Sequence, residues 1–322
     1  GGGWGLILIK IMNIMETIKH ANKILLISHI NPDGDTLGSS GAMSFFIEKQ
    51  LDKPVDLFCV NQIPQNFKFL NLEQFYISPE RLDLNSYDLI IALDCADMRR
   101  TGIEEQLLQT RGKIPLINID HHQTNPMYGD LNIVNADTSS TCEIVFNLFK
   151  KSNIDFDKNI STCLLTGILT DTSYFTNAAT TSLSIKASSF LMNQGVSSKE
   201  ILESVWKNQK LETLKLWGQV LEKLHFNKKH KIATAIINSQ DKVDSNIFEG
   251  FANFLTVIYE ANIILVLTQI EEKLIKASMR TTKENIDVAK IAAQFGGGGH
   301  SKAAGFSLDG QLQETATGWK IV

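Results

Sequence analysis

Three apolar segments of this 322-residue chain run directly into side chains that can bind a metal ion. They are residues 24–27, followed by His29, Asp33 and Asp35; residues 89–93, followed by Asp94; and residues 114–119, followed by Asp120, His121 and His122. Short apolar runs of this kind predict buried strands. Because the carboxyl ends of parallel strands meet at one edge of a sheet, we expect these carboxylates and imidazoles to converge on a single pocket.

The first segment leads to two carboxylates separated by one glycine. Gly34 frees the backbone to bend, so Asp33 and Asp35 can reach two neighbouring points, which suits a pair of divalent cations better than a single one. Mixed carboxylate and imidazole ligands favour Mn²⁺ over Mg²⁺. Pro-Asp-Gly-Asp is also a common turn sequence, but His29 and the preceding strand favour the metal site over that alternative.

Asp94 and the triplet Asp120-His121-His122 extend the same pattern. A carboxylate at the end of a buried run is costly unless it is paired or binds a metal, although Asp94 could instead cap the following helix. In the triplet, one histidine can bind a metal, Asp120 can orient an imidazole, and the other histidine can meet a substrate. Two surface histidines are the alternative. Asp171, after an apolar helical segment, would complete two metal shells, but an Asp at a helix end is common as well.

The periodicity around these motifs predicts an α/β fold with a mostly parallel sheet flanked by helices, because apolar runs and helical segments alternate. The expected strands are residues 24–27, 55–60, 88–94 and 113–120, and the expected helices are residues 36–51, 101–108, 159–170 and 181–192, with another helix starting near residue 140. Gly38 and Gly41 would let the first turns of one helix lie close to the sheet.

The later part of the chain predicts a linker and a second, smaller α+β domain, in agreement with the chain length. We expect a larger domain at residues 14–195, a helical linker at residues 196–230 and a C-terminal substrate-binding domain at residues 231–322. In the smaller domain the expected strands are residues 232–237, 262–270 and 273–279, followed by a helix at residues 286–295 and a glycine-rich loop at residues 296–299.

Candidate phosphate-binding residues occur in both expected domains. They are Arg99, Arg100, Arg280, Gly298, Gly299 and His300. Backbone N–H groups that carry no side chain make an anion nest, although consecutive glycines can also form a flexible hinge. The arginines could hold a phosphate, whereas Arg99 and Arg100 could equally be solvated residues at a helix start.

The composition is that of an ordinary globular protein, with 43% hydrophobic and 20% charged residues and a net charge of -4. This balance excludes nucleic-acid binding through bulk basicity, so local cations or metals must hold any phosphate substrate. Four widely spaced cysteines without metal-site spacing indicate buried thiols in the reducing cytoplasm. Residues 6–12 are apolar but shorter than the roughly 20 residues a membrane span needs, so we expect neither a membrane segment nor a signal peptide.

These motifs resemble the DHH family of phosphoesterases, which is named for a triplet like that at residues 120–122. The family has, in this order, motifs similar to His29-x-x-x-Asp33-x-Asp35, Asp94, Asp120-His121-His122 and Asp171. Residues 296–300, followed by Ala303-Ala304-Gly305, resemble the signature of the DHH-associated C-terminal domain. The likeness extends from about residue 24 to about residue 306, and the chain looks most like the family's group of bifunctional oligoribonucleases (nanoRNases) and phosphatases of adenosine 3',5'-bisphosphate (pAp).

The resemblance implies a ligand set. One metal would be held by His29, Asp33 and Asp94, and a second by Asp35, Asp94, His121 and Asp171, so that Asp94 bridges the two. The ions would be two Mn²⁺, with Mg²⁺ as the alternative. His122 would contact the scissile phosphate, and Asp120 would orient an imidazole rather than bind a metal.

The resemblance also implies substrates. Short oligoribonucleotides would be cleaved to mononucleotides, and pAp to AMP, by a cytoplasmic enzyme that is expected to be a homodimer. Within the same chemistry, the alternatives are a cyclic di-AMP or pApA phosphodiesterase, a RecJ-type single-strand exonuclease and an inorganic pyrophosphatase. From a different class, the chain could be a nucleotide sensor without turnover, which is disfavoured because every ligand position holds Asp or His.

Overall fold

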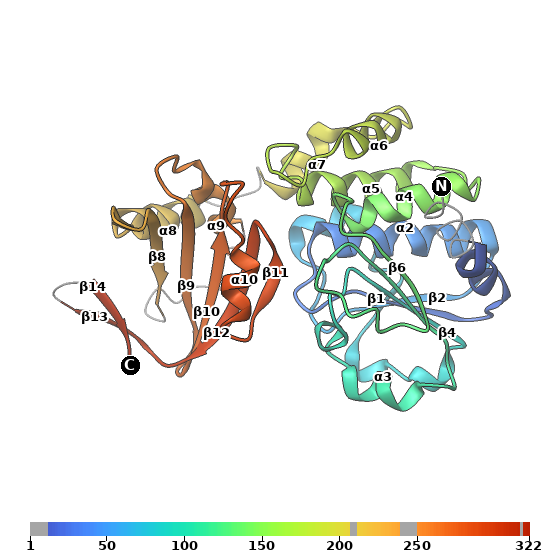
Figure 1. The fold of residues 1–322 in the computed structure, drawn as a ribbon. Coiled ribbons are helices and arrows are strands. Elements are labelled where there is room, and N and C mark those ends of the chain that lie inside the picture. Colours follow the sequence, from blue (N-terminus) through green and yellow to red (C-terminus); the bar gives the residue numbers. More distant parts are fainter. Residues whose placement is uncertain (1–11, 207–210, 239–249, 316–317) are drawn as a thin grey trace. The chain divides into compact units, whose positions relative to one another are not determined.

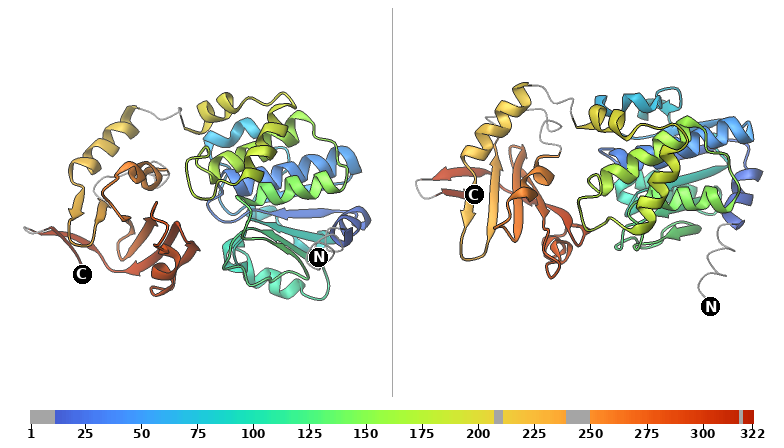
Figure 2. Two further views of the ribbon diagram at one scale, coloured as in Figure 1. Left: turned by 45° about the horizontal axis from the view of Figure 1, so that its top comes forward. Right: turned by 90° about the horizontal axis from the view of Figure 1, so that it is seen from above.

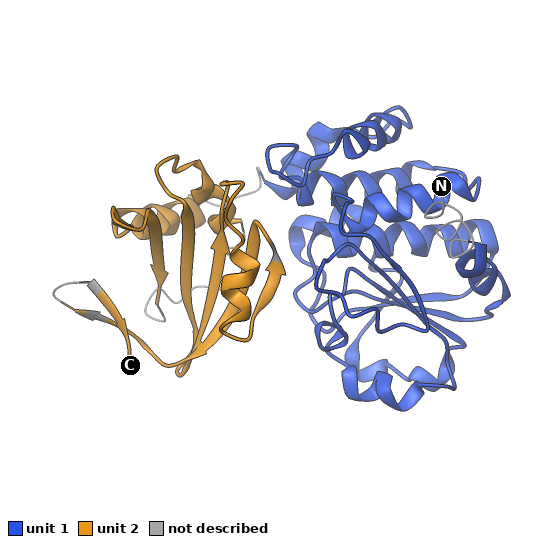
Figure 3. Ribbon diagram, in the orientation of Figure 1, with its two compact units in different colours: residues 1–208 blue, residues 209–322 orange. Residues whose placement is uncertain are grey.

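The computed structural model describes residues 12–206, 211–238, 250–315 and 318–322 of the chain. The chain divides into two compact units, residues 1–208 and residues 209–322 (Figure 3). Each unit has its own sheet and its own hydrophobic core. Within the described ranges, no helix is long and apolar enough to cross a membrane.

Unit 1 is built on a six-stranded sheet in which all neighbouring strands are parallel. The strands are β1 (Ile24–Ile27), β2 (Val55–Phe58), β3 (Tyr76–Ile77), β4 (Leu89–Leu93), β5 (Leu116–Asp120) and β6 (Leu131–Val134). Their order is β3-β2-β1-β4-β5-β6, so the winding direction reverses between β1 and β4, where ligands of such sheets usually bind. The expected α/β class with a mostly parallel sheet is confirmed.

Helices cover both faces of this sheet (Figure 1), and Figure 2 shows the same layers from two other sides. One face carries α2 (Gly34–Leu51), α4 (Thr141–Lys151) and α5 (Lys158–Asp171), with α6 (Ser182–Met192) and α7 (Ser198–Val205) packed against them, and the other face carries α3 (Glu104–Thr110). Residues 12–20 are also helical. Short 3-10 segments occur at Gln65–Leu70, Pro79–Arg81, Leu84–Ser86 and Met98–Thr101.

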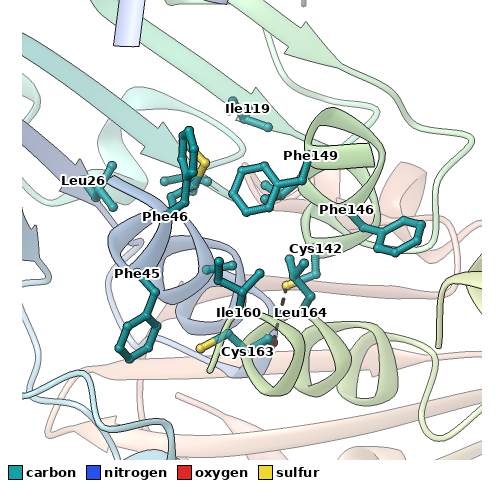
Figure 4. Close-up of a cluster of buried hydrophobic side chains, with 14 of the residues drawn as sticks. Leu26, Phe45, Phe46, Ile119, Cys142, Phe146, Phe149, Ile160, Cys163 and Leu164 are labelled. Atoms are coloured by element: carbon teal, nitrogen blue, oxygen red, sulfur yellow. Dashed lines mark hydrogen bonds between the residues drawn. The ribbon is translucent and has the colours of Figure 1, made fainter. Parts of the chain in front are cut away.

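The larger core of unit 1 lies between α2, α4, α5 and one face of the sheet (Figure 4). Two of the three glycines of α2, Gly38 and Gly41, have a different role from the expected one. A Cβ at Gly38 would collide with the backbone carbonyl of Cys163, and a Cβ at Gly41 would collide with the side chains of Leu72 and Cys163. These glycines therefore let α2 lie close to α5, the helix that ends at Asp171, rather than close to the sheet.

Unit 2 contains a second six-stranded sheet, of mixed direction. Its strands are β7 (His225–Asn227), β8 (Ile232–Ile237), β9 (Ile263–Glu271), β10 (Leu274–Arg280), β11 (Gly298–His300) and β12 (Ala303–Asp309), in the order β11-β12-β10-β9-β8-β7. Its helices are α8 (Leu211–Glu222), α9 (Phe251–Phe254) and α10 (Val288–Ala293), with a 3-10 turn at Leu255–Val257. Strands β13 (Leu312–Thr315) and β14 (Gly318–Ile321) form a separate pair. This is the smaller α+β unit expected from the sequence.

The expected linker at residues 196–230 extends into unit 2. Its second half contains α8, whose Trp217 and Val220 pack in the core of unit 2, and β7, which pairs with β8. Residues 207–210 of this segment lie outside the described residues. The domain limits stated above therefore stay a prediction.

The glycine-rich loop expected at residues 296–299 is wrong for Gly298 and Gly299, which belong to β11 and pair with β12. The glycines are needed for close approach between chain segments. A Cβ at Gly297 would collide with the carbonyl of Gly305, and Gly299 has a φ of 136°, which favours glycine. The glycines therefore make a tightly paired strand instead of an open loop.

Candidate metal centre

Six predicted metal ligands meet at the carboxyl edge of the unit 1 sheet. They are His29 and Asp33 in the loop after β1, Asp35 in the first turn of α2, Asp94 after β4, His121 after β5, and Asp171 at the end of α5. Their potential ligand atoms form groups of three in which all atoms lie within 4.8 Å of one another. The structure thus brings together residues that are far apart in the sequence.

The first group consists of His29, Asp33 and Asp94. Nε2 of His29 lies 3.6 Å from Oδ2 of Asp33 and 3.6 Å from Oδ2 of Asp94. The other ring nitrogen, Nδ1, donates to the carbonyl of Ile30 at 2.7 Å. This second bond fixes the ring so that Nε2 faces the two carboxylates, as in histidines that bind metals.

The second group consists of Asp35, His121 and Asp171. Nε2 of His121 lies 3.7 Å from Oδ2 of Asp35, 3.2 Å from Oδ2 of Asp171 and 3.5 Å from Oδ1 of Asp94. The two oxygens of Asp94 therefore face different groups, with Oδ2 towards His29 and Oδ1 towards His121. Asp94 therefore lies between the two groups.

Close packing, rather than a flexible bend, brings Asp35 to this site. Gly34 does not have a left-handed conformation, but a Cβ on it would collide with the side chain of Thr170. The start of α2 therefore lies directly against the end of α5. Asp33 is the N-cap of α2, and its Oδ1 accepts from the N–H groups of Asp35 (3.0 Å) and Thr36 (3.2 Å).

Several residues of the site have backbone conformations that are unfavourable for side chains other than glycine. Asp94 has a φ of 60°. After Asp171 and Thr172, three consecutive residues, Ser173, Tyr174 and Phe175, have φ values of 48°, 57° and 65°. Left-handed conformations are strained for such residues, and strain of this kind is concentrated at functional sites.

Two carboxyl groups of the second metal group have raised pKa values. Burial and the charge of Asp94 raise the pKa of Asp35, and burial and the charges of Asp35 and Asp33 raise the pKa of Asp171. Both shifts reflect an excess of negative charge in a site from which water is largely excluded. A cation would relieve this repulsion.

The pKa values of His29 and Asp33, which belong to the first group, shift in opposite directions. Burial alone would lower the pKa of His29, but Asp33 and Asp94 outweigh it and raise the pKa to about 10. Burial would raise the pKa of Asp33, but His29 and, more weakly, Arg100 lower it. A protonated His29 thus supplies the positive charge that a metal ion would supply. The donor set and its charge fit divalent cations.

Asp120 holds His122 rather than facing the carboxylates. Its Oδ1 accepts from Nδ1 of His122 at 2.8 Å, and its Oδ2 accepts from the side-chain amide of Asn125 at 2.5 Å. Burial would raise the pKa of Asp120, but these bonds outweigh it and lower the pKa. Nδ1 of His122, which lies 3.6 Å from Oδ1 of Asp94, is therefore already engaged with Asp120. Asn125 was not identified from the sequence, because its link to Asp120 exists only in the folded loop.

The three arginines predicted to bind substrate differ in how exposed they are and in their partners. The side chain of Arg99 is 77% exposed and lies 3.2 Å from Asp97. Arg100 is half-buried. In unit 2, the guanidinium of Arg280 donates from Nε to the side chain of Asn253 at 2.6 Å, and burial lowers its pKa to about 10.

The remaining predicted residues are Gly298, Gly299 and His300, which belong to β11. The side chain of His300 lies outside the described residues. The extended backbone of β11 pairs with β12, so its amides are arranged as a strand and not as an open nest.

Family models match two separate parts of this chain. A model of the DHH family, N-terminal domain, matches residues 23–168, and a model of the DHHA1 domain matches residues 229–317. The chain is 30% identical over 306 residues to the bifunctional oligoribonuclease and PAP phosphatase NrnA of Thermus thermophilus, and the match covers 94% of this chain and 89% of that protein. The protein of the same name from Bacillus subtilis is 24% identical, with 92% of each chain covered.

A solved structure gives the same result for the fold. An exopolyphosphatase-related protein from Bacteroides fragilis superposes with a TM-score of 0.82 and 27% identity, and the match covers 92% of this chain and 90% of that chain. The match to the DHH model precedes the match to the DHHA1 model along the chain, in the same order as the Asp-His-His triplet and the glycine-rich motif. This chain therefore belongs to the DHH family and is a hydrolase that acts on phosphoester bonds.

Proposed function

We propose that this protein is a Mn²⁺-dependent phosphoesterase that hydrolyses short oligoribonucleotides to mononucleotides and pAp to AMP. The relatives of Thermus thermophilus and Bacillus subtilis, which carry both activities in their names, support the substrate class. The single observation that carries the metal dependence is the carboxylate of Asp94, whose two oxygens face two separate groups of ligand atoms.

The proposed ligands of one metal are His29, Asp33 and Asp94, and those of the other are Asp35, Asp94, His121 and Asp171. Two divalent cations bound there would activate a water molecule and neutralise the charge of a phosphate. Mixed carboxylate and imidazole ligands favour Mn²⁺, with Mg²⁺ as the alternative. The protein's own contribution is to bring the six side chains together at the carboxyl edge of the sheet.

His122 is proposed to contact the scissile phosphate. Its Nδ1–H is held by Asp120, so the ring presents Nε2 for that contact. Burial would lower the pKa of His122, but the bond to Asp120 and the charge of Asp94 outweigh it and raise the pKa. The shift is towards the imidazolium form, whose positive charge would suit a phosphate and its leaving group.

Residues outside the metal site, two of them arginines, are proposed to hold the rest of the substrate. In unit 1 this is Arg100, whose charge acts on Asp33, in preference to the exposed Arg99 that was predicted with it. In unit 2 the proposed residues are Arg280, Gly298, Gly299 and His300. We further propose that the protein is a homodimer. A cytoplasmic location is supported by all four cysteines, which are buried free thiols as expected in a reducing compartment.

A substrate panel tests this function. The metal-free protein is given Mn²⁺ or Mg²⁺ and incubated with pAp, pApA, cyclic di-AMP and a long single-stranded RNA, alongside an Asp94→Asn variant as the inactive control. We expect fast release of AMP from pAp and pApA with Mn²⁺ and no release by the variant. Preferential cleavage of cyclic di-AMP would favour the cyclic dinucleotide alternative, and equal rates on long RNA would favour a RecJ-type exonuclease. No hydrolysis with either metal would contradict the proposal.

A further inference from the structure

Thr141, the first residue of α4, forms hydrogen bonds to carboxylates of both ligand groups. Its backbone N–H donates to Oδ2 of Asp35 at 2.7 Å, and its hydroxyl donates to Oδ1 of Asp94 at 3.0 Å. The N–H of Cys142 donates to the other oxygen of Asp35 at 2.8 Å. All four residues are buried. Since an ionised carboxylate only accepts hydrogen bonds, the hydroxyl proton of Thr141 points at Asp94.

The hydroxyl of Thr141 donates to Oδ1, one of the two Asp94 oxygens that a bridging carboxylate must keep in place. Oδ1 lies 3.5 Å from Nε2 of His121, and Oδ2 lies 3.6 Å from Nε2 of His29. Rotation of the carboxylate about its Cβ–Cγ bond would take both oxygens away from these positions. The bond from Thr141 opposes that rotation, and therefore fixes which oxygen faces which group.

The start of α4 is held firmly enough to serve as a reference point. The hydroxyl of Ser140 accepts from the N–H of Glu143 at 3.0 Å as the N-cap of the helix. The N–H and hydroxyl of Ser139 donate to Oε2 of Glu143 at 2.9 Å and 2.6 Å. These bonds fix the backbone on either side of Thr141, so its hydroxyl has a defined position relative to the sheet.

We propose that Thr141 is a positioning residue that holds Asp94, through its hydroxyl, as the bridge between two metal ions. This inference rests on the proposed function and adds to it a residue that touches neither metal nor substrate. The reason is geometric: a bridging carboxylate must keep both oxygens in place before the ions bind, and outer partners of metal ligands commonly provide this restraint.

The test compares Mn²⁺ binding to metal-free full-length variants by titration calorimetry and electron paramagnetic resonance. Thr141→Val removes the hydroxyl but keeps the backbone N–H that Asp35 accepts from. Thr141→Ser restores the hydroxyl. Thr166→Val is the matched control, because Thr166 is equally buried and its hydroxyl donates to the Thr162 carbonyl of its own helix rather than to a candidate metal ligand.

We expect wild-type protein to bind two Mn²⁺ with the spectrum of a magnetically coupled pair. Thr141→Val is expected to bind one of the two ions about 10–100-fold more weakly and to lose the coupled spectrum at Mn²⁺ concentrations that saturate the wild type. The serine variant should bind as wild type does, and so should Thr166→Val. The rate of pAp hydrolysis by each variant is measured in parallel. It should be proportional to the fraction of the protein that holds both Mn²⁺ ions.

Two results would overturn the inference. One is a valine variant that binds both ions and gives the coupled spectrum as wild type does, and the other is a serine variant as defective as the valine variant. If Thr141→Val does not fold, as judged by circular dichroism, Thr141→Ala replaces it, because alanine removes the hydroxyl without adding a methyl group beside the carboxylate. If wild-type protein binds no Mn²⁺, the proposed function fails together with the inference.

Discussion

His122 donates a hydrogen bond from Nδ1 to Oδ1 of Asp120 at 2.8 Å. Asp120 in turn accepts from the N–H of His121 at 2.9 Å and from the amide of Asn125 at 2.5 Å, so its carboxylate is fully engaged in the loop. The first residue of the triplet therefore acts on the third. The tautomer and the direction of the His122 ring are set by this contact.

Asp120→Asn should lower kcat on pAp about 100-fold while leaving the Mn²⁺ stoichiometry unchanged. The amide of an asparagine can donate to Nδ1, which favours the tautomer with the proton on Nε2 and removes the charge that supports the imidazolium. Steady-state kinetics together with calorimetric Mn²⁺ titration check this. A loss of metal binding in step with activity would mean that Asp120 supports the metal site instead.

Metal loading should release protons at neutral pH. The pKa of His29 is raised from 6.5 to about 10 in the metal-free protein, so the ring is protonated there and must lose its proton before Nε2 can bind a metal. The apparent Mn²⁺ affinity should therefore rise as the pH rises from about 6 to 8, about tenfold per pH unit for each proton released. Calorimetry in buffers of different ionisation enthalpy counts these protons, and a count of zero would contradict the prediction.

The same shift gives a stability prediction for the metal-free protein. The folded pKa of His29 lies above the unfolded value of 6.5. The contribution of its protonated ring to stability is therefore fully present below pH 6.5 and is lost as the pH rises through about 10. Bound Mn²⁺ should abolish this loss, which thermal unfolding with and without the metal can show.

Arg100→Ala should lower kcat/KM for pAp about 10–100-fold, whereas Arg99→Ala should leave it nearly unchanged. A charged hydrogen bond to a phosphate contributes roughly 1.5–3 kcal/mol, which corresponds to that range. Arg100 is half-buried and its charge acts on Asp33, while Arg99 is exposed and pairs with Asp97. The two variants carry the same change in net charge, so equal losses would show a general charge effect rather than a specific contact.

Ser173→Gly should raise the free energy of unfolding by up to about 1 kcal/mol. Its φ of 48° is strained for a residue with a Cβ, at about 1–2 kcal/mol, and the extra freedom of glycine in the unfolded chain offsets about 0.5–1 kcal/mol of that gain. The matched control is Ser189→Gly on the exposed face of the right-handed helix α6, which should be destabilising. Urea unfolding of both variants checks this, and an equal loss of stability in the two would contradict it.

The sequence predicted the convergence of the candidate ligands that follow strands, because the pattern is local. His29, Asp94 and His121 each come after a buried apolar run, and parallel strands must deliver their carboxyl ends to one edge. Asp171, in contrast, lies at the end of the helix α5 and not after a strand. Its position depends on how closely α2 and α5 approach, and the sequence predicted that Gly38 and Gly41 allow contact with the sheet instead of with α5.

The residues that the sequence did not reveal act over long chain separations or through packing. Thr141 lies 106 residues from Asp35, and nothing local marks it as a partner of the metal ligands. Gly34 has the expected position beside two carboxylates, but it is required for contact with Thr170 rather than for a bend. Strand β11 was expected as a loop because glycines have low strand propensity, and only its pairing with β12 makes it a strand.

A crystal structure of the protein with Mn²⁺, using anomalous scattering at the manganese edge, tests the central claim most directly. The account predicts two peaks about 3.5–4 Å apart, with Oδ2 of Asp94 on the ion bound by His29 and Oδ1 of Asp94 on the ion bound by His121. A single peak, or two peaks of which only one contacts Asp94, would contradict it.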